Sequence, residues 1–285
     1  MYTYLEQPRG LGAVVGLDTR RLVEDTEKIP FRWICALDLI FPDRADKSKE
    51  QRDRGTGLLI SPRHVLTAAH NVTPAKGVLA HRIHVLPGLD GVNVLGKARA
   101  RVGSLTVEPS AWWIPDSYVK NRDNLHDYAV LTLPREFPPI NAMTYGFWSD
   151  ARFAPRTRIV NVNVGTLAAG GSLTLAGYPG DKCREKACGA IAPGAQIATL
   201  RARKDWASTQ WMASGTIQAN SPPSLILYDM DTYSGISGSP VWQTTPQGDL
   251  VLVAIHTGNG RGLVLSSDVL DAVRPIVRAR AMPTF

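Results

Sequence analysis

The sequence predicts an all-β fold, and three observations lead to this expectation. Short apolar, β-branched runs recur along the 285 residues, and Gly, Pro, Asn and Asp separate them. With 44% hydrophobic and 20% charged residues, the composition is that of an ordinary globular protein. Helical periodicity is clear only near the C-terminal end. Strands at this density predict a barrel or a sandwich, built as one large β domain or as two small lobes.

Each expected strand is a short apolar run that ends at turn residues. These runs cover residues 31–40, 57–60, 64–67, 82–86, 128–133, 159–164, 172–176, 196–201, 210–217, 224–229, 250–256 and 262–265. The proline-rich section 134–139 is the natural seam between two halves. Residues 42–54 (PDRADKSKEQRDR) are dense in charge, which predicts an exposed, mobile loop.

One helix is expected at the C-terminal end, over residues 267–280, with Ser266 or Ser267 as its N-cap. Its apolar face repeats at helical spacing and consists of Val269, Leu270, Val273, Ile276 and Val277. Pro275 falls in the interior, where its ring and missing N–H are expected to kink or shorten the helix.

The charge balance indicates no particular partner. The net charge is +7, and Lys and Arg are scattered apart from a patch at Arg274, Arg278 and Arg280. No aromatic–basic motif accompanies this charge, so a solvated surface is favoured over a nucleic-acid site. No apolar run is long enough to span a bilayer, and residues 1–13 lack the pattern of a secretory signal. We therefore expect neither nucleic acid nor a membrane as a partner.

Three cysteines constrain the redox compartment only weakly. Cys183 and Cys188 flank a short polar stretch and are candidates for a local disulfide in an oxidising compartment. No His or fourth Cys stands near them, which argues against zinc. Cys35 lies in an apolar segment and is interpreted as a buried thiol. We expect no cofactor and see no metal-binding constellation, although a structural calcium stays open.

The stretch 231–242 (DTYSGISGSPVW) carries the clearest chemical signal. Glycines on both sides of Ser237, with a proline soon after, predict a tight turn that exposes the serine. In such a turn the N–H groups of Gly235 and Ser237 can point at one position. Nucleophilic acyl transfer needs an oxygen nucleophile beside two such donors. Because Gly/Ser/Pro clusters usually mark ordinary loops, the interpretation requires a histidine and a carboxylate elsewhere.

His70 and Asp127 are the candidates for these two roles. His70 ends the run TAAH just beyond an expected strand, where small residues leave room around the imidazole. Asp127 opens DYAVLTL, so its carboxylate can be drawn inward and accept the Nδ1 proton of a histidine. The other histidines and several aspartates are interpreted as solvated, structural or turn-forming: His64, His81, His84, His126, Asp116, Asp123 and Asp150.

In this order the motifs TAAH, DYAVL and GISGSP resemble those of the chymotrypsin-like serine proteases. Five further stretches are similar to landmarks of the V8-like glutamyl endopeptidase branch: VVGLDTR at 14–20, VLPG at 85–88, GYPGDK at 177–182, TQWMASG at 209–215 and AIH at 254–256. The resemblance covers about residues 14–280. It implies a protease domain over 14–285, with antiparallel barrels at about 14–138 and 139–266, a helix at 267–280, and the active site between the barrels.

The resemblance also implies a mechanism and a setting. His70 takes the proton of Ser237 as the serine attacks, Asp127 orients His70, and the N–H groups of Gly235 and Ser237 bind the oxyanion. The expected substrate is a protein or peptide, and the expected protein is an extracellular monomer. A catalytically silent relative that serves as a binding module is the alternative from another class.

The resemblance leaves the P1 residue open. Glutamyl endopeptidases bind an acidic P1 side chain with a histidine at the position of His256, and Thr232 is the nearest hydroxyl helper. Asp231 instead matches the position at which trypsin-like enzymes bind Arg or Lys, although Tyr233 replaces the cysteine that walls their pocket. Acidic P1 is the favoured interpretation, and basic P1 is the alternative.

Two departures from the family pattern bear on activation and rigidity. Ile236 replaces the aspartate that pairs with the new N-terminus in chymotrypsin. We therefore expect that residues 1–13 are a propeptide-like segment and that the freed amino group of Val14 assists acidic recognition, as in the V8-like branch. A cysteine pair is also missing around His70, where Thr56 and Asn71 stand near the usual positions, which puts the rigidity of this loop in doubt.

Overall fold

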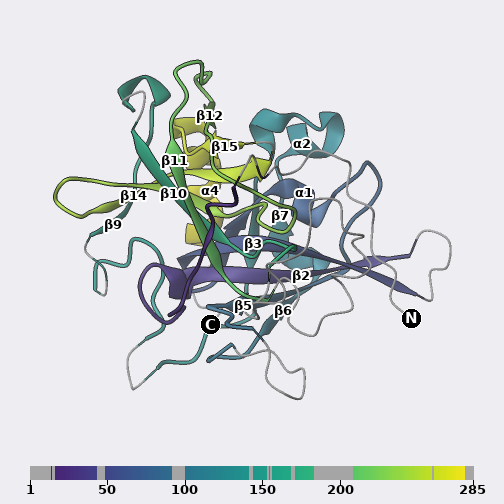
Figure 1. Ribbon diagram of the computed structural model, residues 1–285. Coiled ribbons are helices and arrows are strands. Elements are labelled where there is room, and N and C mark those ends of the chain that lie inside the picture. Colours follow the sequence, from purple (N-terminus) through teal and green to yellow (C-terminus); the bar gives the residue numbers. More distant parts are fainter. Residues whose placement is uncertain are drawn as a thin grey trace.

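The computed structural model describes residue 14 and residues 17–43, 49–91, 100–140, 144–152, 154, 156–167, 171–182, 208–258 and 260–279. Two sheets dominate these residues (Figure 1). In spatial order the first contains seven strands: β6 (Leu105–Val107), β5 (Arg82–Pro87), β2 (Ile34–Pro42), β3 (Glu50–Ser61), β4 (His64–Thr67), β8 (Ala129–Thr132) and β7 (Trp112–Trp113). All of its neighbouring strands are antiparallel.

The second sheet contains eight strands among the described residues. Its main path is β1 (Arg21–Leu22), β11 (Trp211–Thr216), β10 (Ser172–Gly177), β13 (Pro240–Thr244), β14 (Leu250–Gly258), β15 (Arg261–Val264) and β12 (Leu225–Leu227). The short strand β9 (Thr157–Ile159) pairs with β14 in parallel, whereas the other pairings are antiparallel. The start of the chain thus joins the sheet formed by its second half.

Helices are short except at the end of the chain. They are α1 (Ala69–Val72), α2 (Asp116–Asn121) and α4 (Ser267–Ala279), with 3₁₀ turns η1 (Phe31–Trp33), η2 (Pro109–Ala111), η3 (Asn124–His126) and η4 (Val164–Thr166). The expected all-β class with two antiparallel sheets and a C-terminal helix is confirmed. In the described part of the chain, no helix combines the length and apolarity needed to cross a membrane.

Aromatic packing joins the two sheets. Trp148 and Trp242 have ring centroids 5.8 Å apart, and Phe31 packs edge-on against Trp242 with ring centroids 6.4 Å apart. The backbone N–H of Trp148 donates to the carbonyl of Leu59 in β3, while Trp242 belongs to β13. Buried aromatic rings of this size contribute much of the apolar area that holds two layers together. One buried apolar cluster therefore contains residues of both sheets, and a second cluster belongs to the second sheet and its loops.

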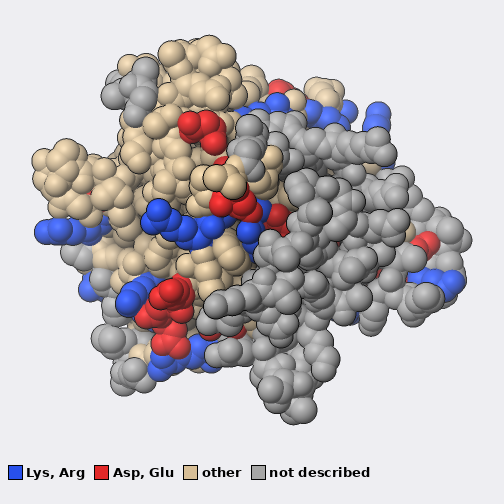
Figure 2. Space-filling model, in the orientation of Figure 1, with Lys and Arg blue, Asp and Glu red and all other residues tan. Residues whose placement is uncertain are grey.

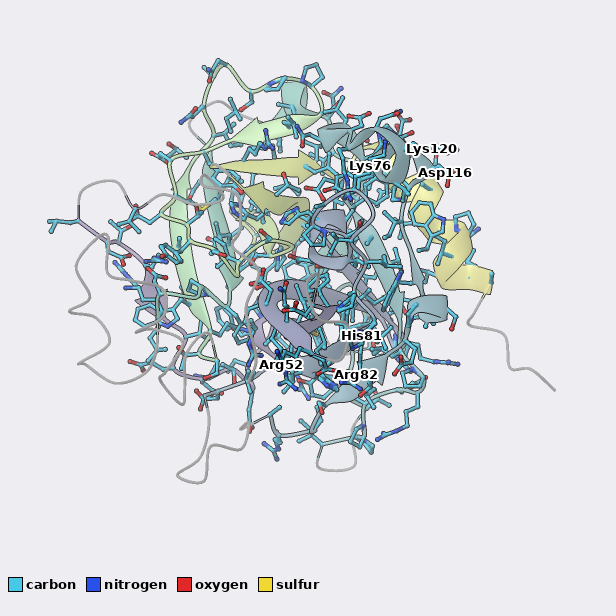
Figure 3. All side chains as sticks on the ribbon, turned by 90° about the vertical axis from the view of Figure 1, so that its right-hand side faces the viewer. Arg52, Lys76, His81, Arg82, Asp116 and Lys120 are labelled. Carbon is cyan, nitrogen blue, oxygen red and sulfur yellow. The ribbon has the colours of Figure 1, made fainter. Side chains whose placement is uncertain are left out.

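The expectation of a loop over residues 42–54 is wrong for the second part of this segment. Residues Glu50 to Arg54 begin β3 and pair with the end of β2, from Pro42 opposite Glu50 to Asp38 opposite Arg54. The charged side chains are accommodated because alternate residues face outward and find partners. Arg52 lies 3.4 Å from Asp38, and Glu50 accepts from Arg82 at 2.8 Å. Figure 3 shows Arg52, His81 and Arg82 close together on this part of the molecule.

Other differences concern short or polar elements. The expected strand 31–40 begins as the turn η1, and the one at 159–164 is shifted to β9. Strands β1, β6, β7 and β13 were not expected, since two or three residues, or a start at a proline, leave little periodicity to detect. The expected strand 196–201 and the disulfide candidates Cys183 and Cys188 lie outside the described residues.

Helix α4 continues past Pro275 to Ala279, so the expected shortening is wrong. Pro275 is exposed, while Val269, Leu270 and Val273 are buried against the core. Packing of this apolar face outweighs the lost hydrogen bond. Cys35 is fully buried, as expected, and burial raises the pKa of its thiol.

Candidate active site

His70 and Asp127 lie together because β4 and β8 are antiparallel neighbours. Thr67 at the end of β4 is opposite Ala129 at the start of β8, so the residues just beyond these ends lie at the same edge of the sheet. The Nδ1 of His70 is 2.7 Å from Oδ2 of Asp127, and the backbone N–H of His70 donates to Oδ1 at 2.9 Å. Both carboxylate oxygens therefore hold one residue, and they fix the imidazole plane and its tautomer.

The opposite nitrogen of His70 is left available. Its Nε2 is buried and has no hydrogen-bond partner in the described structure. Burial by itself lowers the pKa of His70, but the charge of Asp127 and its hydrogen bond outweigh burial and raise the pKa above its usual value. An imidazole oriented in this way is a base with one free nitrogen.

Ser237 is held against the same end of the first sheet. Its carbonyl accepts from the backbone N–H of Thr56 at 2.9 Å and from Nδ2 of Asn71, the residue after His70, at 2.8 Å. Gly238 follows with φ +85°, and a Cβ there would lie 2.1 Å from the Thr56 carbonyl oxygen. Only glycine permits this approach. The serine turn of the second sheet is thus docked beside His70.

Thr56 and Asn71, which stand near the positions of the missing cysteines, hold the loop around His70 by hydrogen bonds. The hydroxyl of Thr56 donates to the carbonyl of Gly235 at 2.9 Å and accepts from the N–H of Tyr178 at 3.1 Å. The amide of Asn71 also donates to the hydroxyl of Thr67 at 2.9 Å. Buried hydrogen bonds of this kind stiffen the loop around His70 and tie it to the serine turn.

The turn leaves two backbone donors unused. Gly235 has φ +102°, and an added Cβ would lie 2.5 Å from the carbonyl oxygen of Tyr178. The carbonyls of Ser234 and Ile236 accept from the N–H groups of Gly180 and Ser239, at 2.7 and 2.9 Å. The N–H groups of Gly235 and Ser237 donate to no acceptor among the described residues. They are available to a developing oxyanion.

His256, near the end of β14, is fully buried. Its Nδ1 is hydrogen-bonded to the hydroxyl of Tyr228, and its Nε2 has no partner within the described residues. Burial, together with the nearby charges of His70 and Arg261, lowers the pKa of His256 to about 3. His256 is therefore neutral at ordinary pH. The backbone N–H of Gly238 donates to the carbonyl of His256 at 2.8 Å, which places His256 beside the serine turn.

Asp231 is buried and binds the beginning of the chain. Its Oδ2 accepts from the backbone N–H and from the hydroxyl of Thr19, each at 2.8 Å. Thr232, the next residue, is buried too. Val14 is about one-third exposed.

Sequence reasoning missed Tyr228 and Arg261. Tyr228 precedes Ser237 by only nine residues, but its contact with His256 depends on how β12 pairs with β15 and β15 with β14. Arg261, in β15, influences the pKa of both His70 and His256. An arginine in a short strand carries no motif. The feature that could have indicated Arg261 was its position shortly after the run AIH at 254–256, which contains His256.

The remaining histidines are paired elsewhere, as expected for structural or solvated side chains. His64 contacts the hydroxyl of Ser61 at 2.6 Å, and His84 contacts that of Thr106 at 2.9 Å. His81 and His126 pair with carboxylates at 3.1 and 2.8 Å. Within the described ranges, no three His, Cys, Asp or Glu side chains are arranged to hold a metal ion.

Comparison with known proteins gives the family. The description "Trypsin-like peptidase domain" applies to residues 55–255. The chain is 27% identical over 277 residues to a glutamyl endopeptidase of Bacillus licheniformis, covering 93% of this chain and 69% of that protein. It is 23% identical over 261 residues to a protein of Bacillus subtilis named "Extracellular metalloprotease", covering 92% and 67%.

A solved structure of a Glu endopeptidase in complex with MPD has the same fold, with a TM-score of 0.60 and 21% identity, covering 95% of this chain and all of that one. The expected resemblance to glutamyl endopeptidases is thus confirmed, and with it the class of enzyme. The chain belongs to the trypsin-like peptidase family and is a serine endopeptidase with the chymotrypsin-like fold.

Proposed function

We propose that the protein cleaves peptide bonds through an acyl-enzyme formed on Ser237. His70 Nε2 takes the proton of Ser237 as its oxygen attacks the scissile carbonyl, and then protonates the leaving amine. Asp127 orients His70 and stabilises its imidazolium. The N–H groups of Gly235 and Ser237 stabilise the oxyanion. The observation that carries this proposal is the two-point hold of Asp127 on His70, with the opposite nitrogen unpaired.

Labelling by a fluorophosphonate probe tests this proposal. Ser237→Ala removes the nucleophile, so labelling and peptide hydrolysis are expected to disappear while the thermal unfolding midpoint stays close to that of the parent protein. Ser239→Ala is the matched control, because Ser239 belongs to the same turn and its Oγ has no partner among the described residues. Full turnover by Ser237→Ala would overturn the assignment. Absence of labelling in the parent protein would favour the silent binding module instead.

For specificity we propose an acidic P1 side chain. The phenol of Tyr228 is buried, which raises its pKa well above the usual value, so it stays protonated and can donate to Nδ1 of His256. The proton of neutral His256 is then on Nε2, the nitrogen without a partner. A neutral N–H donor close to the positive charge of Arg261 suits a carboxylate. The name of the Bacillus licheniformis relative agrees with this choice.

The trypsin-like alternative depends on Asp231. Because Oδ2 of Asp231 accepts two hydrogen bonds from Thr19, part of this carboxylate is already used within the protein. A P1 lysine or arginine would have to share it, which disfavours basic P1. Cleavage rates of four peptides that differ only in Glu, Asp, Arg or Lys at P1 decide between the alternatives, and preference for Arg or Lys would overturn the acidic proposal.

The contact of Thr19 also supports a role for Val14. Thr19 is hydrogen-bonded to Asp231, the neighbour of Thr232. Val14 is five residues before Thr19, and five residues of extended chain span at most about 17 Å. We propose that removal of residues 1–13 frees an amino group at Val14 that assists recognition of an acidic P1. Mass spectrometry of active protein should show the shortened chain, and an intact Met1 in fully active protein would contradict this.

The setting follows the relatives. One of them is named as an extracellular enzyme, and we propose an extracellular, monomeric protease that acts on proteins or peptides. Among the described residues on the face shown in Figure 2, Lys and Arg lie interspersed with Asp and Glu, so this described part presents no continuous basic surface for nucleic acid.

A further inference from the structure

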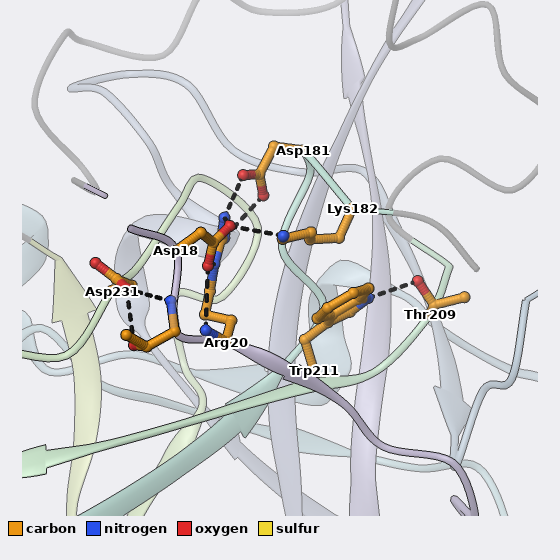
Figure 4. Close-up of polar contacts among 8 residues, drawn as sticks. Asp18, Arg20, Asp181, Lys182, Thr209, Trp211 and Asp231 are labelled. Carbon is orange, nitrogen blue, oxygen red and sulfur yellow. Dashed lines mark hydrogen bonds and ion pairs between the residues drawn. The ribbon is translucent and has the colours of Figure 1, made fainter. Parts of the chain in front are cut away.

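A partly buried cluster of charges joins the beginning of the chain to the segment 178–182 (Figure 4). The Arg20 side chain is only 3% exposed and lies between two carboxylates. Its Nε and Nη2 donate to Asp18 at 2.9 and 2.8 Å, and its Nη1 donates to Asp181 at 2.8 Å. Lys182 adds a second cation, 2.6 Å from Asp18, and its ammonium lies over the ring of Trp211. We call Asp18, Arg20, Asp181 and Lys182 the N-terminal clamp.

The strand pairing explains how the clamp is assembled. In β1, Leu22 is opposite Trp211, and on the other side of β11 the last residue of β10, Gly177, is opposite the same Trp211. Strands β1 and β10 therefore flank the start of β11 on its two sides. The turn at Gly180 and Asp181, just after β10, brings Asp181 to Arg20, 161 positions away in the sequence.

The charges of the clamp are strongly coupled. Burial by itself raises the pKa of Asp18, but the hydrogen bonds from Arg20 and Lys182 outweigh burial and hold it well below its usual value. A buried guanidinium that has two carboxylate partners is costly to break, because removal of one member leaves an unpaired charge. The clamp therefore resists displacement of residues 178–182.

The segment 178–182 in turn orients the backbone N–H of Gly235, one of the two proposed oxyanion donors. The N–H of Gly180, the residue just before Asp181, donates to the carbonyl of Ser234 at 2.7 Å. In a trans peptide the carbonyl and the following N–H point in opposite directions. Holding the Ser234 carbonyl against Gly180 therefore directs the Gly235 N–H to the other side, away from this segment.

The two oxyanion donors differ in what orients them. The peptide before Ser237 is held within the turn itself, since the Ile236 carbonyl accepts from Ser239 at 2.9 Å. The peptide before Gly235 depends on Gly180, which is adjacent to Asp181 and hence to the clamp. Gly235 has φ +102°, a region in which glycine has more than one accessible backbone state, so this peptide is free to rotate once its carbonyl is released.

We infer that Arg20 is a positioning residue for catalysis, which through Asp181 and Gly180 keeps the Gly235 N–H directed at the oxyanion. Thr19 reinforces this arrangement from the other side, because it binds Asp231 near the start of the same turn. Ile236 stands where chymotrypsin has an ion-pairing aspartate, and the clamp supplies an ion-paired anchor from residues inside the chain. This inference rests on the proposed function of Ser237 and its two backbone donors.

Kinetics of Arg20→Gln test the inference. Loss of one oxyanion donor typically costs 10²–10³-fold in rate. We expect kcat to fall by about 10²-fold while KM changes by less than about threefold, because the donor acts on the transition state rather than on bound substrate. The rate constant for phosphonylation by a fluorophosphonate probe is expected to fall in parallel, since that reaction also develops charge on an oxygen in the same position. Arg20→Lys should recover part of both rates.

Two further variants keep the test decisive. Arg274→Gln is the matched control, because Arg274 forms an exposed pair with Asp271 in α4, and it should leave both rates unchanged. Asp181→Asn keeps the Arg20–Asp18 pair intact, and it is expected to lower kcat and phosphonylation as Arg20→Gln does, even if Arg20→Gln does not fold. Unchanged rates in the clamp variants, or a change in KM alone, would overturn the inference. If the parent protein itself does not react with the fluorophosphonate probe, the proposed function fails instead.

Discussion

His70 and His256 both have an imidazole that is hydrogen-bonded at Nδ1, but their pKa values shift in opposite directions. Each imidazole has an oxygen at Nδ1 and an unpaired Nε2. The oxygen belongs to the Asp127 carboxylate in one region and to the Tyr228 phenol in the other. A charged partner raises the pKa of His70, whereas burial without such a partner lowers the pKa of His256 to about 3.

The comparison shows that the charge of the partner, not burial, decides what a histidine can do. A carboxylate stabilises the imidazolium that forms during proton transfer, so His70 can act as a base. A neutral phenol fixes the tautomer but offers no charge, so His256 stays a neutral hydrogen-bond donor. Two histidines near each other can therefore serve proton transfer and substrate recognition without exchanging roles.

Removal of the charge at Asp127 is expected to abolish the difference between the two histidines, and it should cause the largest loss of activity. Asp127→Asn keeps the shape but supplies an amide in place of the carboxylate, so the imidazolium is no longer stabilised and the tautomer is no longer imposed. We expect kcat to fall by about 10⁴-fold. The apparent pKa of the kcat/KM profile should also drop from its raised value, because free His70 must be neutral to act as a base. Asp116→Asn, at an exposed position, is the control.

Removal of the phenol hydroxyl tests the other region. Tyr228→Phe leaves Nδ1 of His256 without its donor, so the proton no longer has a reason to remain on Nε2. We expect kcat/KM for a Glu P1 peptide to fall by about tenfold, a loss comparable to one charge-assisted hydrogen bond. Phosphonylation, which needs no P1 side chain, should change little. An equal loss in both reactions would show that Tyr228 supports the fold rather than recognition.

The last expected effect is on stability rather than on activity. A histidine with a lowered folded pKa binds a proton in the unfolded chain first, so stability is lost as pH falls from about 6.5 towards 3. The folding equilibrium should weaken by up to about tenfold per pH unit in this range. His70 has the opposite sign, and its contribution is present below pH 6.5 and is lost as pH rises through its raised pKa.

Urea unfolding of His256→Gln between pH 4 and 6.5 isolates the contribution of His256. The variant is expected to be less stable at pH 6.5, where the packed imidazole is lost, but to show a shallower dependence on pH. Parallel pH profiles for variant and parent protein would contradict a neutral, buried His256.

Local patterns were sufficient for much of the fold and for the residues proposed as catalytic. His70 lies in α1 just after β4, and Asp127 lies two residues before β8, close to the positions that the short runs TAAH and DYAVL predict. The charged start of β3 was misread because pairing with β2 outweighed its polarity. The strand β13 was missed because it begins at Pro240, where a strand is not expected.

The contacts that refine the site could not be predicted from the sequence because they join distant segments. Thr19 and Asp231 are 212 positions apart, and Arg20 and Asp181 are 161 apart. Asp231 illustrates the point: its position in a motif suggested a basic substrate, and only its contact with Thr19 revealed a partner within the protein.

The sequence by itself determined the all-β class, the order His70, Asp127, Ser237 and the family, since each depends on short runs of residues with definite spacing. Only the tertiary structure decided the partners of His256 and Asp231, the bonds of Thr56 and Asn71, and the clamp around Arg20. The physical reason is that a side chain's charge state and freedom depend on what burial brings next to it, and strand pairing, not sequence distance, sets those neighbours.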